Sequence, residues 1–216
     1  MGGMTLLPDL PALLAFIAAG IALNLTPGPD MMYVAARGAA EGRRAGIVSA
    51  LGIGAGCLVH TALVALGLAA VLAAAPIAYE AIRWLGAGYL LYIAWQIWRQ
   101  GDVPPNLAPI ERASPWRVFA QGALINVLNP KVALFFLAFL PQFVDPASGH
   151  IALRLAILGT IFNVNGTLVN LGVGVMAGEA GRLLARRLAW WRWQNRAVAL
   201  VLAALAARLA FTPGKS

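Results

Sequence analysis

The chain has 216 residues, of which 61% are hydrophobic and 11% charged, and its formal net charge is +8. Soluble domains carry about a quarter charged residues, so this composition excludes an ordinary soluble domain. One cysteine and two histidines cannot supply an intrachain disulfide or a Cys/His zinc site. Residues 47–75 include no Lys, Arg, Asp or Glu, which excludes a solvated basic groove for nucleic acid. We therefore expect a membrane protein with the lipid bilayer as its surroundings, and with no metal, no cofactor and no nucleic-acid partner.

Six stretches are apolar enough to cross a bilayer, for which a helix needs about 20 mostly apolar residues. They cover residues 10–36, 47–75, 77–98, 118–144, 151–178 and 190–211. The sequence therefore predicts an all-α, polytopic membrane protein with six transmembrane helices in a single domain, 1–216. No Lys or Arg precedes Arg37, so the first span lacks the basic start of a cleaved signal peptide, and we expect it to stay in the mature protein.

The Lys and Arg residues predict the orientation of these spans. Eleven of the sixteen lie in the segments after the first, third and fifth spans, and four lie on the opposite side. Short cytoplasmic loops of membrane proteins are enriched in Lys and Arg. Both termini are therefore expected outside the cytoplasm.

A Pro-rich segment over residues 99–117 divides the chain into halves of three spans, about 1–98 and 118–216. Related halves with an odd number of spans must be inverted relative to each other in the membrane. The halves align weakly at an offset of 102 residues, with one gap. The aligned positions are Gly20 with Gly122, Asn24 with Asn126, Pro29 with Pro130 and Asp30 with Lys131. We predict two inverted three-helix repeats whose first helices are broken.

The first break is predicted at Thr26-Pro27-Gly28-Pro29-Asp30, inside the first span. Each proline removes a backbone donor and clashes with the carbonyl four residues earlier. A helix that restarts after the second proline would direct its N-terminal amides and its dipole at an anion. Discontinuous helices of this kind form the substrate sites of transporters built from inverted repeats. A simple kink stabilised by Thr26 is the alternative.

The second break is predicted at Asn129-Pro130-Lys131. A cation at the centre of a span costs about 3 kcal/mol, so Lys131 needs a partner or a function. Asp30 is the expected partner, and the two opposed charges could hold the carboxylate and the ammonium of a zwitterion. A permanent ion pair that never meets substrate is the alternative. The expected substrate-binding residues are Asn24, Thr26, Pro27, Gly28, Pro29, Asp30, Asn126, Asn129, Pro130 and Lys131.

Two residues are candidates for a coupling proton. His60 lies inside the second span, and histidine changes its charge nearest to physiological pH, but a neutral histidine bonded between helices is an equal alternative. Asp30 is the other candidate, because poor solvation favours the protonated form of a carboxylate.

Small and polar residues suggest how the spans pack. Closely spaced glycines allow helix backbones to approach each other, and they are Gly52, Gly54, Gly56, Gly174 and Gly178. Polar side chains crowd the fifth span and either face a cavity or bond neighbouring helices; they are Asn163, Asn165, Thr167 and Asn170.

The two broken-helix motifs resemble those of the lysine exporter/homoserine-threonine resistance family of bacterial amino-acid exporters. The resemblance rests on residues 24–34, Asn-Leu-Thr-Pro-Gly-Pro-Asp-Met-Met-Tyr-Val, and on residues 126–144, which begin Asn-Val-Leu-Asn-Pro-Lys-Val-Ala-Leu-Phe-Phe. The length, the six spans and the glycine-rich second span are similar too. The resemblance implies an exporter of amino acids or related small metabolites in the bacterial cytoplasmic membrane, driven by the proton gradient, and it allows a homodimer.

Other classes of function find less support in the sequence. An intramembrane protease would need a Gly-x-Ser-Gly nucleophile or a His-Glu-x-x-His metal site, and neither motif occurs. An exporter of a metal cation on the same fold is the alternative within transport. The single intramembrane aspartate, without a thiolate or methionine cluster, would make a poor cation site. We therefore do not expect an enzyme.

Overall fold

The structure is a computed structural model, and it describes three continuous parts of the chain and some single residues: residues 6–68, 112–145 and 149–184, with single residues within 84–99 and 196–207. Most of the predicted spans 77–98 and 190–211, and most of the predicted linker 99–117, lie outside the described residues. The arrangement of six spans in two inverted repeats therefore stays a prediction.

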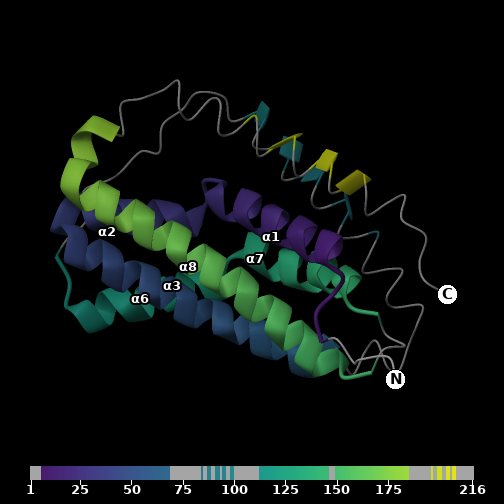
Figure 1. The fold of residues 1–216 in the computed structure, drawn as a ribbon. Coiled ribbons are helices and arrows are strands. Elements are labelled where there is room, and N and C mark those ends of the chain that lie inside the picture. Colours follow the sequence, from purple (N-terminus) through teal and green to yellow (C-terminus); the bar gives the residue numbers. More distant parts are fainter. Residues whose placement is uncertain are drawn as a thin grey trace.

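The continuous parts form helices, and no strand occurs within them (Figure 1). In chain order the helices are α1 (Leu10–Leu25), α2 (Pro29–Glu41), α3 (Arg43–Leu63), the π-helix η1 (Val64–Leu68), α6 (Pro115–Val127), α7 (Pro130–Leu134), the π-helix η2 (Phe135–Phe139), the 3₁₀-helix η3 (Leu140–Phe143) and α8 (Ile151–Leu184). The long helix α8 packs on α1, α2 and α3, and α3 also packs on α6.

Two stretches among the described residues are long and apolar enough to cross a membrane as continuous helices, Arg43–Gly67 and Ile151–Glu179. Two further spans result if each bent pair of helices is taken together. Helices α1 and α2 are bent by 53°, and α6 is bent by 46° against Pro130–Phe143. These two to four spans correspond to the predicted first, second, fourth and fifth spans. The predicted breaks in the first and fourth spans are confirmed.

The first break follows directly from its prolines. Helix α1 ends at Leu25, and Thr26 is extended, with φ −68° and ψ 125°. The Thr26 hydroxyl donates to the carbonyl of Ala22 at 2.9 Å, so this side chain is satisfied within the last turn of α1. Helix α2 then begins at Pro29, whose fixed φ and missing N–H suit the first position of a helix.

The second break has its own cap. Asn129 is extended, and its side-chain oxygen accepts from the backbone N–H of Lys131 at 3.0 Å. An N-cap asparagine and a proline in the first position are both favourable helix starts. Helix α7 continues as π-helix and then as 3₁₀-helix, a departure from regular α-helix that is common near functional sites.

Glycines allow α3 to approach two neighbouring helices closely. A Cβ atom on Gly52 would clash with the backbone carbonyl of Phe119 in α6, and one on Gly46 would lie 2.5 Å from the carbonyl oxygen of Gly174 in α8. The clashing atoms belong to the backbone and cannot rotate away. The prediction that small residues bring these helices together is therefore confirmed for α3, α6 and α8.

An aromatic core holds the second half-helix against α1 and α8. Phe135 and Phe162 stack at 4.4 Å between ring centroids, and Phe16 lies 6.1 Å from Phe135. Phe136 meets Phe162 edge-on at 5.4 Å. All four rings are buried. Large buried rings bury much apolar area and favour these geometries, so this core anchors the chain beyond the second break.

A buried polar cluster joins α2 to α6 at the other end of these helices. The Tyr33 hydroxyl donates to the carbonyl of Val118 at 2.8 Å, and Arg37 donates to the side-chain oxygen of Gln121 at 2.8 Å. Arg37 also forms an ion pair with Glu41. Because Arg37 is only 5% exposed, its charge depends on these partners, and the cluster stabilises the contact between the two helices.

Candidate functional site

The two helix breaks lie against each other inside the described helices. The carboxylate of Asp30, in the first turn of α2, accepts from the side-chain nitrogen of Asn126 in the last turn of α6, at 2.8 Å. Lys131, at the start of α7, reaches in turn to the end of α1. Residues separated by about a hundred positions in the sequence thus meet at one place.

Lys131 contacts backbone carbonyls and not Asp30. Its ammonium donates to the carbonyl of Leu23 at 3.2 Å and to that of Thr26 at 3.0 Å. Lys131 and Asp30 are both described, and they form no ion pair with each other. The expected pairing of the two charges is therefore wrong in this conformation, and so is the alternative of a permanent ion pair between them.

The physical reason lies in the proline that breaks α1. In a helix, a carbonyl accepts from the N–H four residues later. The residue four positions after Leu23 is Pro27, which has no N–H, so the usual helical donor to the Leu23 carbonyl is missing and the N–H of Thr26 reaches it at 3.1 Å instead. The C-terminal end of a helix also favours a cation. Lys131 therefore satisfies carbonyls that the break exposes, as an apolar surrounding requires.

At the second break, His60 bonds a carbonyl that has lost its helical donor, as Lys131 does at the first break. Its Nε2 lies 3.0 Å from the carbonyl oxygen of Asn126, which also accepts from the N–H of Asn129 at 2.9 Å. The residue four positions after Asn126 is Pro130, so here too the usual helical donor is missing. Because a carbonyl only accepts, Nε2 must carry a hydrogen. A neutral histidine already meets this need, so the bond itself requires no change of charge.

Replacing His60 should separate its role as a hydrogen-bond donor from a role as the coupling-proton residue. In His60→Gln, the side-chain amide keeps an N–H donor but does not titrate, and we expect transport and thermal stability close to those of the unchanged protein. In His60→Leu the donor is lost, and we expect stability to fall by about 1 kcal/mol, the net value of a typical hydrogen bond. Thermal unfolding in detergent and transport on both sides of neutral pH measure the two effects. Normal folding of His60→Gln with abolished transport would instead identify His60 as the coupling-proton residue.

A small polar cavity lies beside the two breaks. Its volume is about 10 Å³, roughly what a single water molecule needs. The residues that line it come from α1, α2, α3, α6, α7 and α8: Asn24, Asp30, Ile53, Cys57, Asn126, Val132, Phe162, Asn163, Gly166 and Asn170.

The polar atoms around this cavity are not all satisfied within the protein. Asp30 Oδ1, Asn126 Oδ1 and Asn170 Oδ1 are buried acceptors without a hydrogen-bond partner, and Asn24 Nδ2 is a buried donor without one. Buried polar groups are nearly always paired, so each exception calls for a ligand, a water or a function. The cavity therefore offers unpaired polar atoms to a ligand, as a binding site does, but in this structure its volume is very small.

The predicted site residues divide into two groups. Asn24, Asp30 and Asn126 line the cavity. The remaining ones form or satisfy the breaks without lining it; they are Thr26, Pro27, Gly28, Pro29, Asn129, Pro130 and Lys131. The amides of α8 were expected either to face a cavity or to bond other helices, and the structure assigns Asn163 and Asn170 to the cavity.

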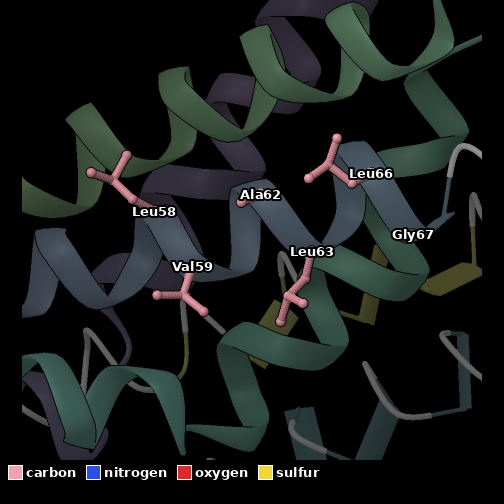
Figure 2. Close-up of a pocket in the computed structure, with 6 residues that line it drawn as sticks. All are labelled: Leu58, Val59, Ala62, Leu63, Leu66 and Gly67. Atoms are coloured by element: carbon pink, nitrogen blue, oxygen red, sulfur yellow. The ribbon is translucent and has the colours of Figure 1, made fainter.

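A larger groove on the outer face of α3 and η1 has no such chemistry. Figure 2 shows the apolar side chains that line it, from Leu58, Val59, Ala62, Leu63, Leu66 and Gly67. Its volume is about 650 Å³, and its leucines are more than half exposed. These residues offer no polar side chain to an amino acid. A surface of this composition suits lipid tails, so we take the polar cavity as the candidate site.

Broken apolar helices around a buried polar cavity are typical of membrane transport proteins, and this is the class that the fold and site indicate. The chain belongs to the LysE type translocator family, whose model matches residues 21–212. It is similar to the homoserine/homoserine lactone efflux protein of Salmonella typhimurium, with 30% identity over 177 residues that cover 82% of each chain.

Two further relatives extend the comparison. The leucine efflux protein of Salmonella choleraesuis is 27% identical over 150 residues, which cover 69% of this chain and 71% of the relative. A membrane protein of Vibrio cholerae is 28% identical over 176 residues, which cover 82% of this chain and 85% of the relative. No solved structure matches the chain significantly. The resemblance seen in the two motifs is thus confirmed at the level of the family.

Proposed function

We propose that this protein is a secondary active exporter of amino acids in the bacterial cytoplasmic membrane, with its substrate site at the two helix breaks. The observation that carries the proposal is the cavity between them, where a carboxylate and three amides present unpaired buried atoms. Family membership and the efflux relatives support the direction of transport and the class of cargo.

The named cargoes of the relatives share one chemical group. Homoserine, homoserine lactone and leucine all carry an α-amino group, which is protonated in the amino acids at neutral pH. They do not all carry a carboxylate, because the lactone has none that is free. The anionic group of the cavity is Asp30, and an anion is the natural partner of an ammonium. We therefore assign the ammonium of the substrate to Asp30. We assign the carboxylate of the substrate, where it has one, to the amides at the start of α2 or to the remaining N–H of Lys131.

Alternating access is part of the proposal, and the small size of the cavity supports it. At about 10 Å³ it is far too small for an amino acid, so the site must open before it can bind one. The contacts between the breaks are reciprocal: Lys131 reaches from the second half to the end of α1, and Asp30 of the first half binds Asn126 at the end of α6. This exchange supports two inverted repeats that move against each other. The proposal also places both termini outside the cytoplasm and includes a homodimer as the assembly.

Proton coupling is part of the proposal. Protonation of Asp30 from the outside would remove its negative charge, weaken its hold on the ammonium and favour release. The inward proton gradient would then drive export.

Replacing Asp30 with asparagine tests the proposal. Asparagine keeps the size of the side chain and an oxygen that can accept from Asn126, but it has no charge and does not titrate, so we expect a folded protein with transport reduced at least about tenfold. Cells loaded with dipeptides would be followed for the appearance of each amino acid outside. The matched control is Asp9→Asn, because Asp9 is the exposed cap of α1 and asparagine caps equally well.

Two outcomes would contradict this proposal in different ways. Unchanged export and unchanged pH dependence in Asp30→Asn would exclude Asp30 from ammonium binding and from coupling. If the unchanged protein is present in the membrane but exports no amino acid, the cargo belongs to another class of small metabolite or is a metal cation.

A further inference from the structure

Helix α8 adds a polar group to those that the two broken helices bring to the cavity. Asn170 is 5% exposed, lines the cavity and leaves its Oδ1 without a hydrogen-bond partner. Asn163 also lines the cavity, but its Oδ1 already accepts from the hydroxyl of Thr167 at 3.3 Å. Among the described amides of α8, Asn170 is thus the one that lines the cavity and has an unpaired acceptor.

The orientation of the neighbouring acceptors follows from Asp30. A carboxylate only accepts, so the side-chain nitrogen of Asn126 must point at Asp30 Oδ2, and its Oδ1 is left as an acceptor. Asp30 Oδ1 is a second acceptor, and Asn170 Oδ1 is a third. The three come from α6, α2 and α8, that is, from three different helices around one cavity.

We propose that Asp30, Asn126 and Asn170 form a subsite for a primary ammonium group, in which Asn170 provides the third acceptor. This inference rests on the proposed function and names the group of the substrate that the site recognises. A primary ammonium has three N–H donors, one for each acceptor. Asn24 Nδ2, the unpaired donor of the cavity, is then available to an oxygen of the same substrate.

A bound water matches this set of atoms less well. Water donates two hydrogen bonds, so it would leave one of the three buried acceptors without a donor. It would also bring no positive charge to the carboxylate of Asp30. An ammonium group supplies both the third donor and a positive charge.

The affinity of the subsite should therefore depend on the number of N–H donors on the substrate nitrogen. An α-amino acid donates three hydrogen bonds and an N-methyl amino acid donates two. A 2-hydroxy acid presents a neutral hydroxyl with a single donor. We expect the protein to prefer them in that order, and we expect the difference between the first two to depend on Asn170.

The test compares transport of L-leucine and L-homoserine with inhibition by N-methyl-L-leucine, in the full chain reconstituted into vesicles. For Asn170→Leu, we expect the half-saturating concentration of the amino acid to rise about tenfold or more, the usual effect of losing a hydrogen bond to a charged group. The preference for leucine over its N-methyl analogue should disappear in this variant, which a purely structural role of Asn170 would not cause.

Two further variants complete the test. Asn170→Asp keeps an acceptor oxygen at the site and should retain transport and the preference. Asn165→Leu removes another amide of α8, one that does not line the cavity, and should leave both unchanged.

Several results would overturn the subsite. One is an unchanged preference for leucine in folded Asn170→Leu. Another is lost transport in folded Asn170→Asp. This result would contradict the subsite even if Asn170→Leu does not fold. If the unchanged protein transports neither amino acid, the proposed function itself fails, and this result is distinct from a failure of Asn170 alone.

Discussion

Replacing Lys131 with methionine should lower both the thermal stability of the protein and its transport activity. Methionine has a similar length and fills similar space, but it cannot donate to the carbonyls of Leu23 and Thr26. The Leu23 carbonyl would keep the N–H of Thr26 at 3.1 Å, whereas the Thr26 carbonyl would lose the donor that Lys131 supplies. A buried acceptor left without a donor costs about 1–3 kcal/mol, and in hydrocarbon the cost is higher. Thermal unfolding in detergent should show a clear decrease of Tm, and export should fall at least about tenfold.

The control for this variant is Arg43→Met, which removes a positive charge of the same size from an exposed position. Arg43 lies 3.4 Å from Glu179, and both side chains are 61% exposed, so the loss of this pair should change Tm very little. An unchanged Tm in Lys131→Met would contradict the capping role. If export were then lost as well, Lys131 would act on the substrate and not on α1.

Replacing Gly52 with alanine should weaken the contact between α3 and α6. The added Cβ would clash with the backbone carbonyl of Phe119, so one helix backbone must move. Overpacking of this kind costs about 1–3 kcal/mol even where side chains can yield, and here the obstacle is backbone. We expect a lower Tm, less monodisperse protein in detergent and reduced transport, because the same two helices carry His60 and Asn126.

Gly172→Ala is the matched control within α8. Nothing lies within 4 Å of a Cβ atom at this position, so alanine should fit without strain. Alanine also favours helix over glycine by about 1 kcal/mol, and the variant should be as stable as the unchanged protein or slightly more stable. Equal Tm values for Gly52→Ala and Gly172→Ala would show that the close approach of α3 and α6 does not depend on glycine.

The breaks illustrate what can be predicted from the sequence. A proline inside an apolar span removes a donor and blocks the helix whatever surrounds it, so both breaks were predicted at the residues where they occur. The same rule identifies Leu23 and Asn126 as the carbonyls that lose their helical donors, because they precede Pro27 and Pro130 by four positions. This signal in the sequence indicates which carbonyls need a donor, but it does not indicate which side chains supply one.

Composition and proline act locally, so the sequence by itself determined a helical membrane protein that is broken in its first and fourth predicted spans. Its two motifs, by their resemblance to a known family, indicated the LysE type. Only the tertiary structure decided which groups meet at the breaks. Charge alone suggested that Lys131 pairs with Asp30, whereas the packed helices bring its ammonium to the end of α1. Which side chains of α8 reach the cavity depends on how this helix is rotated against its neighbours, and that rotation results from packing and not from spacing along the chain.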